Sequence, residues 1–157
     1  MRNLDRNNPD VVERAMARYL VVRAAGFIEA VRDDVADLFA TEKASGEVAR
    51  RIRVHLRGGQ GVTPEQLLTF VNSFHPSWHG ELDALLSCED NLLRGRIGAM
   101  VAARKKIAHG DGENVTTSRA LAWTEAAEEV VKWLVKRFDP KQPASLPVSD
   151  TSNNPLT

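Results

Sequence analysis

Arg104 and His109 lie five positions apart in the segment Arg104-Lys105-Lys106-Ile107-Ala108-His109-Gly110. A guanidinium group can bind a phosphate through two parallel hydrogen bonds. An imidazole can accept or release a proton near neutral pH. These two groups are sufficient for metal-free cleavage of RNA, in which the ribose 2′-hydroxyl supplies the nucleophile. The pair is therefore a candidate for phosphodiester chemistry; the alternative is a surface arginine and a histidine that caps the C-terminus of a helix.

The charges around this pair favour an anionic ligand. Between Asn91 and Gly110 the chain has no Asp or Glu, and its basic residues there are Arg94, Arg96, Arg104, Lys105 and Lys106. Arg94 and Arg96 either extend the contacts with phosphates or lie on a solvated helix face. Far upstream, Glu29 lies within an apolar helical stretch. It either orients Arg104 through a salt bridge or faces the solvent.

Helix geometry constrains how the pair can work. Five residues of an ideal helix turn through about 500°, so the two side chains start roughly 140° apart. Either the helix ends between them and His109 turns back, or more than one chain contributes to the site. A two-fold dimer would bring two such sets together around one phosphate. One histidine would then take the 2′-hydroxyl proton and the other would protonate the leaving 5′-oxygen, while the arginines stabilise the developing charge.

Composition excludes several classes of protein. The chain has 157 residues, with 21 Lys and Arg against 21 Asp and Glu. Such a length suits one domain, and the zero net charge argues against non-specific coating of nucleic acid. The single cysteine, Cys88, excludes an internal disulfide and a multi-cysteine metal site. His75 and His79 are four apart, but Pro76 interrupts the helix between them, so we expect neither metal nor cofactor.

The chain also lacks a membrane signature. No apolar run approaches the roughly 18 residues of a spanning helix, and the polar N-terminus has no hydrophobic leader. We therefore expect a cytoplasmic protein without a membrane partner.

Helical periodicity extends over almost the whole chain and predicts an all-α bundle of four to six helices. A long first helix is expected from Pro9 to the low forties, and a shorter one from Gly46 to Leu56. A third should begin after Thr63, which forms a capping box with Gln66. The apolar face of the first helix is predicted to contain Met16, Leu20, Phe27, Val31, Val35 and Leu38.

The second half of the chain continues this pattern. Apolar positions recur from Leu82 to Ile107, and Gly110 and Gly112 should close that element. A last helix is expected over Ser118–Phe138, with its core side formed by Leu121, Ala127, Val130, Val131, Leu134 and Phe138. The predicted domain thus covers residues 9–138, and the Pro- and Ser-rich residues 139–157 are expected to form a flexible tail.

Residues 104–110 resemble the arginine–histidine motif of the HEPN superfamily, many members of which carry Ile-Ala-His-Gly at its end. The second residue of that motif is usually Asn, Asp or His, whereas this chain has Lys105. Tyr19 to Glu29 resembles the first long helix of the RiboL-PSP-HEPN group, and Leu67 to Trp78 resembles its middle segment. The resemblance covers roughly Val12 to Phe138.

This resemblance implies a HEPN-type helical domain that is usually dimeric. Active members are metal-independent endoribonucleases, often toxins or effectors of phage defence. Carried over, Arg104 and His109 are the catalytic pair, with Lys105 and Lys106 in support. The expected partners are RNA, a second copy and an antitoxin or defence-system protein. Since Gly110 follows His109, the tyrosine that extends the motif in some toxins is absent.

A second interpretation stays open. The chain could be a non-catalytic helical module that binds RNA or a partner protein. Its neutral net charge and the lysine at position 105 favour this alternative.

Overall fold

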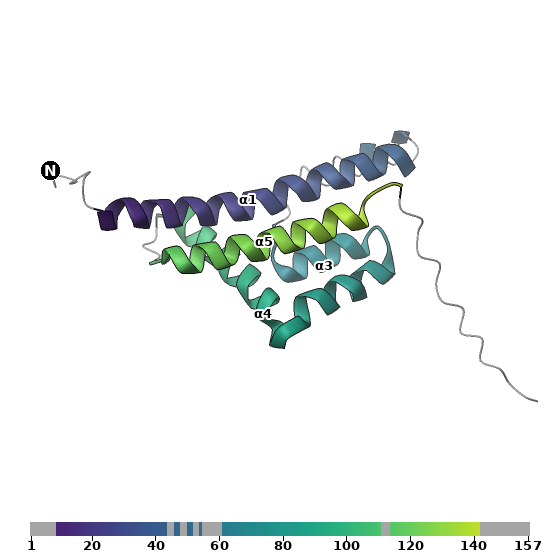
Figure 1. The fold of residues 1–157 in the computed structure, drawn as a ribbon. Helices are drawn as coiled ribbons and strands as arrows, with labels where there is room; N and C mark the ends of the chain where they lie inside the picture. Colours follow the sequence, from purple (N-terminus) through teal and green to yellow (C-terminus); the bar gives the residue numbers. More distant parts are fainter. Residues whose placement is uncertain are drawn as a thin grey trace, which may run out of the picture.

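The computed structural model describes residues 9–43, 46–47, 50–51, 54, 61–110 and 114–141, which form an all-α fold. Its helices are α1 (Pro9–Lys43), α3 (Pro64–Asn72), α4 (Pro76–Ala108) and α5 (Thr117–Arg137). α1 and α5 lie side by side and run in the same direction, with α3 and α4 packed on one side of them (Figure 1). None of the helices in the described ranges combines the length and apolar character needed to cross a bilayer. Most of the predicted helix 46–56, Gly112 and residues 142–157 lie outside the described residues.

The helix boundaries follow from capping side chains. The Thr63 hydroxyl accepts a hydrogen bond from the Gln66 N–H (3.3 Å), and the Gln66 side chain accepts one from the Thr63 N–H (3.0 Å). This confirms the predicted capping box at the start of α3. The Thr116 hydroxyl accepts a hydrogen bond from the Arg119 N–H (3.3 Å) and caps α5, which begins one residue before the predicted Ser118.

The face of α1 that enters the core differs from the predicted one. Its buried residues are mostly small: Ala17, Val21, Ala24, Ala25, Ile28, Ala36 and Ala40. Met16, Phe27 and Leu38 are about half exposed, so their assignment to the core was wrong. Small side chains let the axes of two helices approach closely, and α5 packs against this alanine-rich stripe. Leu121 of α5 was also assigned to the core wrongly, since it is exposed.

A sharp break divides α4, which the periodicity predicted as uninterrupted. Glu89, Asp90 and Asn91 all have positive φ, between 51° and 64°, a left-handed conformation that Asp and Asn tolerate better than most residues. Residues 76–87 and 92–108 therefore run in different directions (Figure 1). The second half turns toward α1, and this break decides where Arg104 lies.

An aromatic cluster fills the core at the C-terminal end of α5. Phe138, at the C-cap of α5, contacts four rings with centroid distances between 4.8 and 5.7 Å: Phe39, Phe70, Phe74 and Trp78. Trp78 and Trp123 are buried and Trp133 is partly buried. The tryptophans therefore stabilise the fold and offer no exposed stacking surface for bases.

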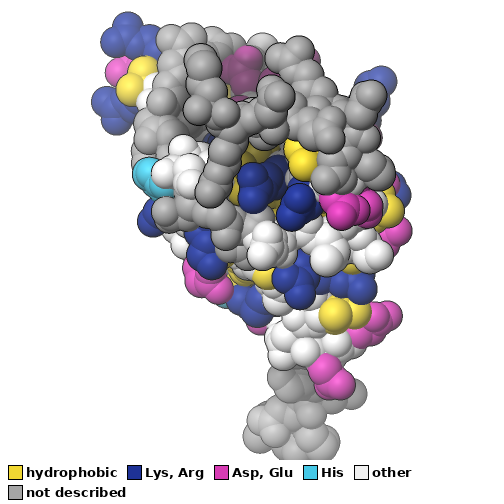
Figure 2. Space-filling model, turned by 90° about the vertical axis from the view of Figure 1, so that its left-hand side faces the viewer, with side chains coloured by type: hydrophobic (Ala, Val, Ile, Leu, Met, Phe, Trp, Pro, Cys, Tyr) yellow, Lys and Arg dark blue, Asp and Glu magenta, His cyan; other side chains and the backbone are white. Residues whose placement is uncertain are grey.

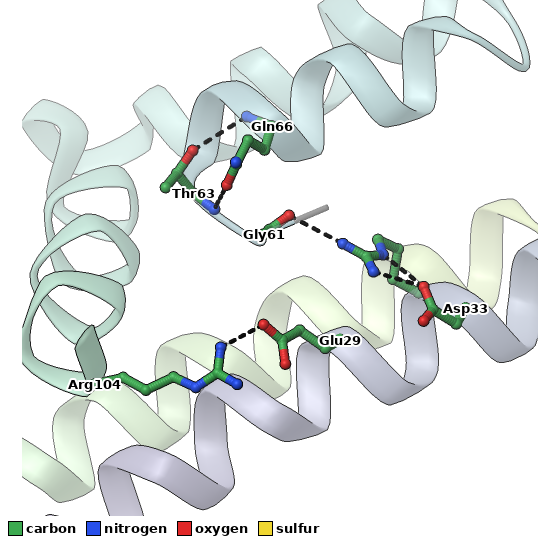
Figure 3. A network of polar contacts seen from close by, with 7 residues as sticks. Glu29, Asp33, Gly61, Thr63, Gln66 and Arg104 are labelled. Carbon is green, nitrogen blue, oxygen red and sulfur yellow. Dashed lines mark hydrogen bonds and ion pairs between the residues drawn. The ribbon is translucent and has the colours of Figure 1, made fainter. Parts of the chain in front are cut away.

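Arg32 is a buried charged residue that the sequence interpretation missed. Its guanidinium donates to the Asp33 carboxylate at 2.6 and 2.8 Å and to the Gly61 carbonyl at 3.0 Å (Figure 3). It also lies 5.8 Å from the centroid of the Phe70 ring. Arg32 thereby ties α1 to the segment that leads into α3. Its spacing of four from Ile28 and from Ala36 was a signal that it belongs to the inner face of α1.

Candidate active site

One end of the molecule gathers basic side chains. α1 and α5 begin there and α4 ends there (Figure 1), and Lys and Arg side chains occupy the middle of that face with hydrophobic side chains between them (Figure 2). The basic residues of these helix ends are Arg14, Arg18, Lys105, Lys106 and Arg119. Asp10 and Glu13 lie at the start of α1 as well. Although the net charge is zero, the charge is unevenly distributed, and this end can attract an anion locally.

Arg104 reaches from α4 to the middle of α1. Its Nη1 donates a hydrogen bond to Oε1 of Glu29, and the two side chains point toward each other (Figure 3). The side chains are 36% and 26% exposed. The predicted salt bridge is confirmed, and the solvent-facing alternative for Glu29 is wrong. A guanidinium has five N–H donors, so one such contact orients Arg104 and leaves donors for a second anion.

His109 ends α4. Its backbone has φ −87° and ψ 2°, and its N–H donates to the carbonyl of Lys105 at 3.1 Å. Gly110 follows with φ +77°, and its N–H donates to the Ile107 carbonyl at 3.2 Å. A residue other than glycine would be strained at this φ, which explains the glycine after the histidine.

The backbone of His109 bears on the two arrangements considered for the pair. Because the chain keeps close to the helical path through His109, the Cα–Cβ bonds of the two residues start roughly 140° apart. An exposed imidazole and a partly exposed guanidinium thus lie on one helix end and start from it in different directions.

The supporting candidates divide into two groups. Lys105 and Lys106 are exposed in the last turn of α4, beside the catalytic candidates. Arg94 instead lies near the break, where it pairs with Asp83 and, at 3.4 Å, with Glu65. Arg96 is partly buried and lines a small hollow next to the break. Of the four basic candidates, the structure therefore places only the two lysines beside Arg104 and His109.

The other residues with reactive or metal-binding side chains offer less support for a functional site. The Nδ1 of His75 accepts from the Ser77 N–H at 3.3 Å, which makes this histidine the cap of α4. No group of three or more His, Cys, Asp and Glu side chains that could hold a metal ion occurs among the described residues. Cys88 is exposed at the break, with its Sγ 3.2 Å from the Ala84 carbonyl oxygen.

A pocket of about 360 Å³ opens at the same end of the molecule. It lies between the first turns of α1 and the segment that leads into α5, and its charged lining residues are Asp10, Glu13 and Arg14. The Thr117 hydroxyl donates to the Glu13 carboxylate across it at 2.7 Å. Neither Arg104 nor His109 lines this pocket, and its two carboxylates disfavour a phosphate there.

Comparisons of the chain with models of protein families, with curated proteins and with solved structures find no match.

Proposed function

We propose that this protein is a metal-independent endoribonuclease with a HEPN-type domain and a composite active site at a homodimer interface. The observation that carries the proposal is that an oriented, partly exposed Arg104 lies on the same helix end as His109. Arg104 is oriented by Glu29 and still partly exposed, while the exposed His109 ends the same helix. Both lie on the last turns of α4, which ends at the basic end of the molecule, where the phosphates of RNA are attracted.

The reaction needs a base, an acid and a cation. One His109 imidazole takes the proton of the ribose 2′-hydroxyl, whose oxygen attacks the adjacent phosphorus. The bond from phosphorus to the 5′-oxygen breaks, and a second imidazole gives that oxygen a proton. Arg104 stabilises the additional negative charge on the non-bridging oxygens. The products are a 2′,3′-cyclic phosphate and a 5′-hydroxyl.

A second chain supplies the second His109 imidazole that the reaction needs. Because the Cα–Cβ bonds of Arg104 and His109 start roughly 140° apart on the helix, it is unfavourable for one protomer to contact one phosphate from both sides. In a two-fold dimer each scissile phosphate meets groups from both protomers. Glu29 is a positioning residue in this scheme, because it contacts Arg104 rather than the RNA. Lys105 and Lys106 neutralise neighbouring phosphates.

The biological setting follows from the resemblance of the motif. A self-contained RNA-cutting domain of this kind suits a cytoplasmic toxin or a defence effector, restrained by an antitoxin or an activating partner. Growth arrest on expression, relieved by His109→Ala, would support this setting.

The proposal is tested with purified protein and end-labelled RNA in the presence of EDTA. The wild-type chain should cut the RNA, and the 5′ products should carry cyclic phosphates. His109→Ala should lower the cleavage rate by about a hundredfold or more, the contribution typical of general acid–base catalysis. His79→Ala is the matched control, because His79 is also exposed on α4 but lies in its first half, before the break. Undiminished cleavage by the His109→Ala protein would contradict the assignment.

The alternative function is a non-catalytic module that binds RNA or a protein. The zero net charge and the lysine at position 105 favour it. RNA binding without turnover that is insensitive to Arg104→Ala would support this alternative over the nuclease.

A further inference from the structure

α1 carries a second apolar face, which points away from the core. Most of the large exposed hydrophobic residues in the described part of the chain lie on this helix, and Tyr19 is 57% exposed. The exposed residues of this face are Val12, Met16, Tyr19, Arg23, Phe27, Ala30, Asp34, Leu38 and Thr41, which fall within an arc of about 100° on a helical wheel. A contiguous apolar stripe of this kind on the outside of a folded chain marks an interaction surface.

The two exposed charged residues of this face, Arg23 and Asp34, specify its partner. Arg23 and Asp34 are both exposed, and neither forms an ion pair with another residue of the described ranges. They have opposite signs and lie on either side of Phe27 and Ala30. Asp37 is the one further charged residue of α1 within this arc; it lies at the edge of the arc and is only partly exposed. A partner helix that fits must therefore present a negative charge at one place and a positive charge at another, with apolar residues between them.

α1 itself meets this requirement when it is reversed. We infer that the outer face of α1 binds the same face of a second copy in antiparallel orientation. When Arg23 lies opposite the partner's Asp34, Asp34 lies opposite the partner's Arg23, because a two-fold contact is reciprocal. The same register sets Phe27 against the partner's Ala30 and Tyr19 against the partner's Leu38. Large side chains then face smaller or flexible ones, and both charges are neutralised.

This register also relates the two candidate active sites. Its midpoint lies between Ile28 and Glu29, so the two Glu29–Arg104 contacts come level with each other along the paired helices. The two-fold axis runs perpendicular to these helices, and it keeps the corresponding flank of both helices on one side of the dimer. Both Arg104 residues therefore flank the axis on the same side. This last step rests on the proposed function, whereas the pairing of the helices does not.

The test is an exchange of charges, read by sedimentation velocity of the full chain over a concentration series. The wild-type protein should dimerise. Arg23→Glu places two carboxylates opposite each other at both ends of the contact, and it should raise the dissociation constant by about tenfold or more. Asp34→Arg should do the same through two guanidinium groups. The double variant should restore the dissociation constant to near the wild-type value.

Lys136→Glu is the matched control, because Lys136 is an exposed base near the end of α5 and outside this face. It should leave dimerisation unchanged. Since all three positions are exposed, circular dichroism should show the same helix content in every variant. A protein that stays monomeric, a dimer that ignores both single reversals, or a double variant that stays dissociated would overturn the inference.

Cleavage assays on the same proteins separate this inference from the proposed function. A dimer that responds to the charge exchange but leaves RNA intact supports the helix pairing and contradicts the nuclease. Full cleavage by dissociated Arg23→Glu protein supports an RNA-cutting site that works without this interface. That second result, with dissociation observed, leaves the pairing supported and removes only its link to catalysis.

Discussion

Arg94 and Arg104 lie ten residues apart on the second half of α4, and both contact a carboxylate from another part of the fold. Arg94 contacts two carboxylates, Asp83 of the first half of α4 and Glu65 of α3, and it is 27% exposed. Arg104 contacts only Glu29 and is 36% exposed. The neighbours also differ, because Arg94 is surrounded by acids whereas Arg104 is followed by Lys105 and Lys106.

The difference shows how the same residue type on one helix serves two purposes. Both terminal nitrogens of Arg94 donate to carboxylates, whose two negative charges outweigh its single positive charge, so Arg94 holds the break in α4 in place. The single carboxylate on Arg104 orients the guanidinium and leaves donors and positive potential available. Exposure alone does not separate the two arginines; the number and placement of their acidic partners does.

Among the variants that test this comparison, Arg104→Ala should have the largest effect. Loss of a donor that stabilises transition-state charge should lower the single-turnover rate of RNA cleavage by about a hundredfold or more. The free energy of unfolding should change by less than about 1 kcal/mol, because the ion pair with Glu29 is partly exposed. Cleavage rates and urea unfolding on the same preparation check both outcomes. A large loss of stability with little loss of rate would mean that Arg104, like Arg94, has a structural role.

Arg94→Ala should behave in the opposite way. Two carboxylates lose their partner, and the contact across the break in α4 disappears. We expect the free energy of unfolding to fall by about 1 to 2 kcal/mol. Below the melting temperature, the cleavage rate should stay within about twofold of wild type, the range expected of a change outside the site. A hundredfold loss of rate with unchanged stability would place Arg94 in the phosphate-binding surface.

Much of the fold could be predicted because local signals decide it. Thr63 and Gln66 define the start of α3 through their own side chains, and Gly110 ends α4 because the backbone there needs a positive φ. These effects act between residues a few positions apart. Periodicity located the helices for the same reason.

The inner face of α1 and the break in α4 could not be predicted in this way. Periodicity assigns large apolar residues to the core, but the close approach of α5 selects the alanines, and Met16 and Phe27 are left outside. The left-handed run Glu89-Asp90-Asn91 contains no glycine or proline, the residues that usually signal such a break. The contact of Arg104 with Glu29 joins residues 75 positions apart, so only the three-dimensional fold could decide between the two readings of Glu29.

Glu29→Gln tests the role of the carboxylate that contacts Arg104. The amide keeps a hydrogen-bond acceptor for Arg104 but removes the charge that restrains it. We expect kcat to fall about three- to tenfold through poorer positioning, with KM unchanged or lower because a negative charge near the RNA is lost. Glu81→Gln is the matched control, since Glu81 pairs with Arg137 between α4 and α5. A fall in stability with unchanged kcat would reduce Glu29 to a purely structural partner.

Lys105→Gln has the smallest expected effect and tests the surroundings of Arg104 rather than Arg104 itself. Lys105 is exposed in the last turn of α4, where a lysine can neutralise one phosphate without contacting the reacting atoms. Its loss should weaken RNA binding a few-fold and reduce the slope of log affinity against log salt by roughly 0.7, the value for one phosphate of a single strand. Lys136→Gln, near the opposite end of α5, should leave the slope unchanged. Because a slope counts released ions and is insensitive to folding, it separates a phosphate contact from a general loss of stability. An unchanged slope in both variants would mean that RNA does not reach the end of α4, and the positive potential around Arg104 would then not distinguish its role from that of Arg94.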